Sequence, residues 1–321
     1  MRHKSLAMFA LNYGILLMLI ALLIFFSVMS PNFMTVGTMV TILKQIMIIG
    51  IVSIGSAFVI LTGGIDLSVG SVAAVSAVTA AILMLNGMPV LLACLVTVLI
   101  AGVYGAINGL LITKIAVPPL IATLATMTSL RGLAFIITGG LPVFGFSTTF
   151  GQFASGTFLG LPYPVILLLA LYGFAIWFLG RTTMGRYIYG VGSNQEASRL
   201  SGINVGWVKI FTYMVSGLLA GVAGLVLLSR TNSGQPGAAS GYEMEAITSV
   251  VLGGIALTGG EGKISLVLVG AVIMGVLKTG MVMLNVNDYV QMVVQGGVLI
   301  LAVALSVMTQ RIRKRLADLP A

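Results

Sequence analysis

Long apolar stretches recur along the whole chain and alternate with short polar segments. Each stretch approaches the ~20 residues that an α-helix needs to cross about 30 Å of hydrocarbon. The alternating polar and apolar positions of a membrane β-barrel strand do not occur in them. The pattern predicts an all-α fold, a polytopic transmembrane helical bundle that forms a single domain over residues 1–321. About ten spans are predicted, over residues 8–29, 42–62, 66–86, 89–112, 117–138, 162–180, 207–229, 243–260, 264–284 and 289–309.

The basic residues orient this bundle in the membrane. Ten spans place both termini on one side of the membrane. Arg230 is then the only basic residue in the outer loops 30–41, 139–161, 230–242 and 285–288. This asymmetry obeys the positive-inside rule, so both termini and the loop 181–206 are predicted to be cytoplasmic. The inner segments hold 12 of the 16 basic residues: Arg2, Lys4, Lys114, Arg181, Arg186, Arg199, Lys209, Lys263, Arg311, Arg313, Lys314 and Arg315.

Composition excludes several classes of protein. A soluble domain contains about 25% charged residues, whereas this chain has 7% charged and 59% hydrophobic residues. Cys94 and His3 are the only cysteine and histidine, which excludes a disulfide framework, a thiolate metal cluster and histidine-based catalysis. We expect no metal site and no cofactor. The net charge of +9 reflects membrane orientation rather than nucleic-acid binding. The first stretch exceeds a signal-peptide core and is expected to be a retained span.

Two glycine-rich interruptions break the apolar pattern, LTGGIDLSVGS at 61–71 and LGGIALTGGEG at 252–262. Paired interruptions of this kind can mark half-helices that line a transport site. Both face the cytoplasm in the predicted topology, so an inverted repeat does not superpose them. Lys263 does not complete a phosphate-binding loop, because Leu257 and Ile264 stand where that motif needs Gly and Ser or Thr.

Asp66 is the strongest single candidate for a functional residue. A carboxylate at membrane depth is costly and is a functional-site hypothesis by default. Asp66 and the nearby Ser68 could instead cap the helix that begins at about residue 66. A role as a gate or coupling residue of a translocation pathway is the second interpretation.

Uncharged hydrogen-bonding residues lie inside other predicted spans. Asn108, Thr123 and Thr126 could line a path for a neutral polyhydroxy solute, or bond carbonyl groups of their own helices. Arg131 lies deep in its span, at a depth comparable to that of Glu243 and Glu245. We predict a structural ion pair between Arg131 and one of these two carboxylates.

Residues 181–204 (RTTMGRYIYGVGSNQEASRLSGIN) form a polar segment inside an otherwise lipid-soluble chain. We interpret it as a cytoplasmic loop that receives mechanical work from a soluble partner. Asn194 is predicted to cap a short helix that starts at Gln195, with Glu196 in its first turn. Gly202 is predicted to end this helix in the left-handed conformation.

Three motifs in order carry a family resemblance: LTGGIDLSVGS (61–71), TTMGRYIYGVGSNQEASRLSGINV (182–205) and GYEMEAITSVVLGGIALTGGEGK (241–263). With SPNFMT at 30–35 and PPLIATLATM at 118–127, the chain resembles, over nearly its full length, the permease subunits of ribose-type ABC importers. The resemblance implies a bacterial inner-membrane permease that works as a dimer, two cytoplasmic ATPase domains and a periplasmic sugar-binding protein. It further implies a coupling helix at 192–202, carried by Gly192, Asn194, Glu196, Ala197, Arg199, Leu200 and Gly202.

Two rival functions were weighed against an ATP-driven monosaccharide permease. A secondary transporter or facilitator of small polyhydroxy solutes would need no partner ATPase and would have no use for the 192–202 element. A membrane-bound transfer enzyme would need a nucleophile and base, or a carboxylate pair, and no such set is visible. We therefore expect a protein that is not an enzyme. The sequence leaves open which sugar is carried and whether the second permease is an identical copy or a sister chain.

Overall fold

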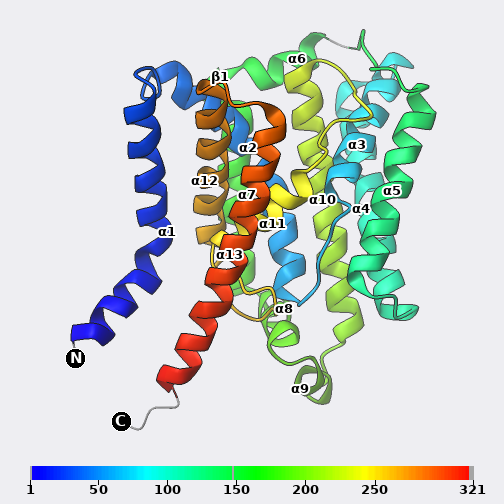
Figure 1. Cartoon of the computed structure of the whole chain (residues 1–321). Coiled ribbons are helices and arrows are strands. Elements are labelled where there is room, and N and C mark those ends of the chain that lie inside the picture. Colours follow the sequence, from blue (N-terminus) through cyan, green and yellow to red (C-terminus); the bar gives the residue numbers. More distant parts are fainter. Residues whose placement is uncertain (1, 147, 318–321) are drawn as a thin grey trace.

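The computed structural model describes residues 2–146 and 148–317 as a bundle of helices (Figure 1). Side chains are described for residues 14–146, 150–151 and 153–308, so the terminal basic residues predicted to be cytoplasmic lie outside them. The helices are α1 (Arg2–Met29), α2 (Val36–Leu61), α3 (Val69–Leu85), α4 (Val90–Lys114), α5 (Pro119–Thr138), α6 (Thr148–Ser155), α7 (Tyr163–Arg181), α8 (Thr183–Ser193), α9 (Gln195–Leu200), α10 (Val205–Thr231), α11 (Tyr242–Leu252), α12 (Ile264–Met283) and α13 (Asp288–Ala317). A short antiparallel pair, β1 (Thr157–Phe158) and β2 (Leu161–Pro162), joins α6 to α7.

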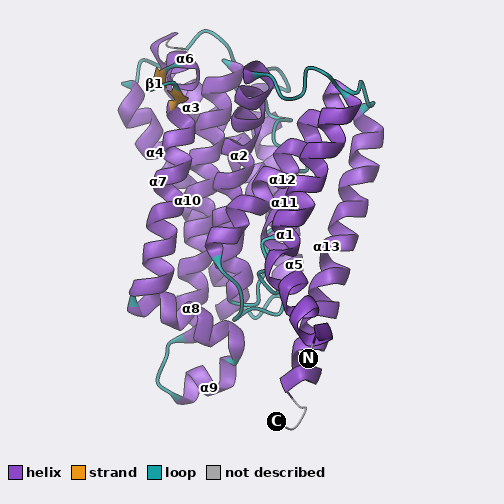
Figure 2. Ribbon diagram, turned by 90° about the vertical axis from the view of Figure 1, so that its left-hand side faces the viewer, coloured by secondary structure: helices purple, strands orange, loops and turns teal. Residues whose placement is uncertain are grey.

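The two ends of the bundle differ in character. Helix α1 begins and α13 ends at the same end as α8 and α9, whereas α6 and β1 lie at the opposite end (Figures 1 and 2). The start of α1, the end of α13 and the α8–α9 segment therefore lie at one end of the bundle. Below, the end that carries α8 and α9 is called the inner end, and the other the outer end.

Seven helices within the described part of the chain are long and apolar enough to cross a membrane: α2, α4, α5, α7, α10, α12 and α13. Two shorter apolar helical stretches are Gly14–Met29, the part of α1 whose side chains are described, and Val69–Leu85, which is α3. The structure thus shows a polytopic helical membrane protein.

The predicted span 243–260 is wrong as a continuous helix. Helix α11 ends at Leu252 after 11 residues, a length of about 16 Å at 1.5 Å per residue. It stops because Gly253 and Gly254 follow, and Gly254 has a φ of +80°, which a helix cannot continue through. Residues 253–263 form an irregular connection to α12 instead.

Helix α2 forms the centre of the bundle, where it packs against α7, α10, α11 and α12. An apolar stretch of 18 residues in α2 is 83% buried, whereas the corresponding stretch of α13 is 11% buried. Peripheral helices expose large apolar side chains outward, such as Leu99 on α4, Ile136 on α5 and Trp177 on α7. Such an apolar exterior fits a lipid environment, since isolated soluble domains rarely expose contiguous apolar surface of this extent.

Helices α4 and α10 are in close backbone contact through glycines. A Cβ atom added to Gly105 would lie 2.1 Å from the Tyr213 carbonyl oxygen, and one added to Gly217 would lie 2.3 Å from the Ala101 carbonyl oxygen. Small residues at a crossing let membrane helices approach in this way. Gly217, Gly221 and Gly224 therefore form a small-residue packing surface of α10.

Replacing Gly217 by valine is expected to destabilise the bundle by about 1–3 kcal/mol or more, because the added atoms overlap the α4 backbone. The matched control is Gly132→Val on α5, where nothing lies within 4 Å of an added Cβ atom. Apparent thermal unfolding temperatures of the purified chains in detergent test this expectation. Equal temperatures for both variants would contradict the close α4–α10 contact.

Candidate functional site

An extended segment, residues 62–68, leads from the inner end of α2 back into the bundle before α3 begins (Figure 1). Asp66 lies in this segment and is only 2% exposed. Its Oδ1 accepts hydrogen bonds from the Ser68 backbone N–H at 2.9 Å and from the Ser68 hydroxyl at 2.6 Å. Its Oδ2 accepts a hydrogen bond from the Ser216 hydroxyl of α10 at 2.7 Å. Asp66 therefore forms a side-chain turn just before α3, whose N-cap position belongs to Ser68.

Helices α4 and α5 extend this cluster. The Asn108 amide of α4 donates to the Ser68 hydroxyl at 2.9 Å, and the Thr126 hydroxyl of α5 contacts the Asn108 carbonyl oxygen at 2.5 Å. The Ile65 carbonyl oxygen is 3.5 Å from the Thr123 hydroxyl and accepts from the Tyr213 hydroxyl at 3.1 Å. We call this set the Asp66 network; it comprises Asp66, Ser68, Asn108, Thr123, Thr126, Tyr213 and Ser216.

The structure brings together all five residues that were predicted as a pathway or gate. The Thr123 and Thr126 hydroxyls also lie 2.9 Å and 2.7 Å from carbonyl oxygens of their own helix, as the second interpretation of these residues expects. Their part in a translocation pathway stays a prediction. Tyr213 and Ser216 were missed. Their hydroxyls sit on a long apolar helix, and no local pattern indicates that they face a segment almost 150 residues earlier.

A second buried polar cluster lies between α11 and α12. The Lys278 Nζ atom is 2.8 Å from Glu245 Oε1 and 5.3 Å from the centre of the Tyr242 ring. Glu245 is 4% exposed, and its Oε2 atom has no hydrogen-bond partner among the described residues. Lys278 thus compensates a carboxylate that would otherwise be isolated at membrane depth.

This contact corrects one of the two pairings predicted for Arg131, because Glu245 pairs with Lys278. Among the described side chains no ion pair joins Arg131 to Glu243, the other predicted partner. The Arg131 guanidinium instead donates to the carbonyl oxygens of Pro236 and Ala238, at 3.0 Å and 2.5 Å. Glu243 lies on the side of α11 that faces α3. Its carboxylate is so close to Gly70 of α3 that a Cβ atom added to Gly70 would lie 2.5 Å from it. Glu243 and Glu245 point apart because residues two positions apart on a helix are rotated by about 200°. Only Glu245 can therefore face α12.

The polar segment between α7 and α10 folds as the sequence indicates. Asn194 caps α9 by accepting a hydrogen bond from the Ala197 N–H at 2.9 Å. Gly202 has a φ of +82°, and the Ile203 N–H closes the helix end by donating to the Ser198 carbonyl at 3.1 Å. The predicted short helix with its two end signals is therefore confirmed.

Helix α9 projects from the inner end of the bundle (Figure 2). Ser198 is its buried residue, and Lys209 of α10 donates to the Gln195 side chain at 2.9 Å. Glu196 and Arg199 pair with each other at 2.7 Å on the exposed surface. Leu200 is 80% exposed. The helix is thus held from the α10 side and presents an apolar tip with a charged rim to the solvent.

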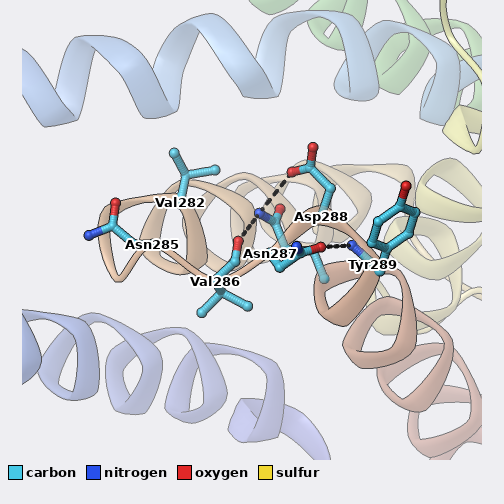
Figure 3. A pocket seen from close by; sticks show the side chains of 7 residues that line it. Val282, Asn285, Val286, Asn287, Asp288 and Tyr289 are labelled. Atoms are coloured by element: carbon cyan, nitrogen blue, oxygen red, sulfur yellow. Dashed lines mark hydrogen bonds between the residues drawn. The ribbon is translucent and has the colours of Figure 1, made fainter.

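A separate pocket lies at the outer end, at the turn between α12 and α13 (Figure 3). Its polar groups bond one another: the Gln291 amide donates to Val286 O and Asp288 Oδ1, and the Tyr289 N–H donates to Asn287 Oδ1. These contacts stabilise the turn. The pocket is remote from α9, which lies at the inner end of the bundle.

Comparison with known proteins identifies the class of the protein. Residues 38–303 match the family described as branched-chain amino acid transport system / permease component. The ribose import permease protein RbsC of Bacillus subtilis (strain 168) is 43% identical over 294 residues, which cover 91% of each chain. The D-allose transport system permease protein AlsC of Escherichia coli (strain K12) is 38% identical over 302 residues, 93% of this chain and 92% of AlsC.

The chain therefore belongs to this family of transport-system permeases. The L-arabinose ABC transporter permease protein AraH of Azospirillum brasilense is 38% identical over 293 residues, 90% of this chain and 86% of AraH. No solved structure matches the chain.

Removing the Ser216 hydroxyl is expected to destabilise the Asp66 network. Ser216→Ala leaves a buried Asp66 oxygen without its partner, at a cost of about 1–3 kcal/mol. The control is Ser53→Ala, since Ser53 is equally buried but bonds only the Ile49 carbonyl of its own helix. Thermal unfolding in detergent should place Ser216→Ala clearly below Ser53→Ala. The reverse order would show that the network does not hold the 62–68 segment.

Breaking the Lys278–Glu245 pair on one side is expected to be severe. Lys278→Met leaves Glu245 buried without a counter-charge, which costs about 3–5 kcal/mol. The double variant Lys278→Met with Glu245→Gln removes both charges and should recover much of the lost stability. Recovery is measured by unfolding temperature and by the yield of monodisperse protein. A double variant no better than Lys278→Met alone would refute the pairing.

Proposed function

We propose that the chain is the membrane-spanning permease subunit of an ATP-driven ABC importer for a monosaccharide, namely ribose or a related pentose, hexose or polyol. The observation that carries the proposal is the 43% identity to a ribose import permease over 91% of both chains. Relatives named for allose and arabinose extend the substrate class to monosaccharides without selecting one.

The proposed topology has ten membrane-embedded segments, with both termini and residues 181–206 in the cytoplasm of a bacterial cell. The segments are α1 to α5, α7 and α10 to α13, of which α3 and α11 are short. The shared inner position of the start of α1, the end of α13 and α9 supports this topology. The distribution of basic residues along the sequence supports the same orientation.

Helix α9 is proposed to dock on a cytoplasmic ATPase subunit. The exposed Leu200 suits an apolar hollow in a partner, and the Glu196–Arg199 pair suits its rim. The proposed machine also contains a second permease copy or sister permease, and a periplasmic sugar-binding protein that delivers substrate to the outer end. ATP-driven closure of the ATPase pair would then pull or push α9 and switch the side to which the pathway opens.

The Asp66 network is proposed to act as a gate of the pathway. Non-helical backbone at membrane depth occurs only where it is buried in protein or lines a water-filled cavity. Such a segment contains Asp66 and Ser68. It is held by Asn108 of α4 and by Thr123 and Thr126 of α5. Their short neutral or singly charged side chains can exchange hydrogen bonds with sugar hydroxyls when the segment moves. No residue of this chain is assigned catalysis, since ATP hydrolysis belongs to the partner.

An ATPase-independent transporter or facilitator is the less supported alternative. A facilitator needs no partner subunits, whereas the matching family is described as the permease component of a transport system. A facilitator would also have no use for an exposed short helix that is capped at both ends, as α9 is.

The proposal predicts that Leu200→Glu abolishes recovery of a soluble ATPase with the tagged chain from native membranes. Placing a charge in an apolar contact should weaken docking by about 2 kcal/mol or more. The matched control is Leu159→Glu, because Leu159 is 89% exposed on the β1–β2 turn at the outer end. Cells that depend on each variant are assayed for uptake of labelled ribose, allose and arabinose. Uptake that persists without any co-purifying ATPase would favour the facilitator.

A further inference from the structure

Three glycine-rich backbone segments meet at the inner end of the bundle. They are the end of α2 with the residues that follow it (61–64), the end of α8 (190–193) and the connection between α11 and α12 (258–262). The Gly260 N–H donates to the Leu61 carbonyl oxygen at 2.9 Å, which joins the first and third segments directly. We call this meeting point the glycine junction; it comprises Leu61, Gly63, Gly192, Gly259 and Gly260.

The contacts across the glycine junction are between backbones. A Cβ atom on Gly192 would lie 1.9 Å from the Leu61 carbonyl oxygen and 2.4 Å from the Gly260 nitrogen. A Cβ atom on Gly260 would lie 2.4 Å from the Ser193 nitrogen, and one on Gly259 would lie 2.6 Å from the Gly63 nitrogen. Backbone atoms cannot swing aside as a flexible side chain can, so the segments have no slack between them.

Two different constraints select glycine here. Gly63, Gly259 and Gly260 have φ values of +76°, +84° and +75°, where residues with a side chain are strained. Gly192 lies in the last turn of α8 and needs no unusual backbone angle. Its requirement is space alone. A hydrogen bond of 3.0 Å from the Tyr189 hydroxyl to the Gly262 carbonyl adds a second link between α8 and the third segment.

Each segment leads to a different working part of the molecule. Gly192 lies two residues before Asn194, the cap of α9. Leu61 leads into the 62–68 segment, which is held by the Asp66 network. The 258–262 segment connects α12 to α11, which carries Glu245 against Lys278. One set of backbone contacts therefore connects the end of α8, next to α9, with both irregular segments of the bundle.

The connection between α8 and α9 is also short. Asn194 is the single residue between them, and its own N–H still bonds the Gly190 carbonyl of α8 at 3.0 Å. Such a joint transmits movement because it has few free dihedral angles with which to absorb it.

We propose that the glycine junction transmits movement of α9 to the 62–68 and 253–263 segments, and that Gly192 is the positioning residue of this step. The inference rests on the proposed function, since it needs a partner ATPase that moves α9. It goes beyond docking, because it identifies where the chain couples docking to the pathway.

The test compares Gly192→Ala with Gly190→Ala. Both glycines lie in α8, but a Cβ atom on Gly190 would meet only the Ser198 hydroxyl, at an ordinary 3.5 Å. For each variant we would measure ATP hydrolysis by the complex purified through a tag on this chain, and uptake of labelled ribose, allose and arabinose by cells that depend on it. Gly192→Ala is expected to keep the ATPase bound and active while uptake falls about tenfold. Gly190→Ala should match the native chain in both measurements.

Tyr189→Phe provides a second variant in case Gly192→Ala does not assemble. It removes the hydroxyl that bonds Gly262 and adds no volume, so assembly should be retained while uptake per ATP hydrolysed falls several-fold. A native ratio of uptake to hydrolysis in an assembled Gly192→Ala complex overturns the proposal. If Gly192→Ala does not assemble, a native ratio in Tyr189→Phe overturns it.

A parallel loss of hydrolysis and uptake in the variants that assemble also overturns the proposal, because it indicates a structural defect rather than lost transmission. Failure of the proposed function has a different signature. In that case the native chain itself supports no uptake of the three sugars and co-purifies with no ATPase.

Discussion

Backbone polar groups inside a membrane must find partners within the protein, and the extended segment 62–68 depends on this constraint. A helix satisfies its own N–H and C=O groups, but this segment does not. Asp66 supplies acceptors to the Ser68 N–H and hydroxyl and to Ser216, while Tyr213 donates to the Ile65 carbonyl. These bonds tie α10 to one irregular stretch of chain, and Asn108 of α4 and Thr123 of α5 bond the same stretch. The position of α3, which begins directly after it, follows from these bonds.

The same constraint explains the charged residues at membrane depth. Lys278 compensates Glu245, and Arg131 is satisfied by two carbonyl oxygens of the loop that precedes α11. Both arrangements surround α11, the short helix that does not cross the bundle. Charges are thus placed where the helical pattern breaks, and the breaks are where a transporter needs segments that can move.

The inner end combines a rigid joint with an exposed tip. Helix α9 presents Leu200 to the solvent, while Gly192 at the end of α8 is in contact with the backbones of two other segments. The residues proposed for docking and for transmission therefore lie in one short stretch of the chain. Its polar composition fits the proposed position outside lipid, and it contains glycine because three backbones converge on it.

Local signals in the sequence were sufficient for the membrane class, for the seven long apolar helices and for the α9 helix, because apolar length, Asn194 and Gly202 act within a few residues of themselves. The polar candidates around Asp66 were also identified, since each is unusual in its own span. Only the tertiary structure showed which residues meet. Asp66 bonds Ser216, Glu245 pairs with Lys278 rather than with Arg131, and Gly192 packs against Leu61 and Gly260. These pairings depend on helix rotation and on backbone approach between segments far apart in the chain, and neither quantity is encoded in any local pattern of residues.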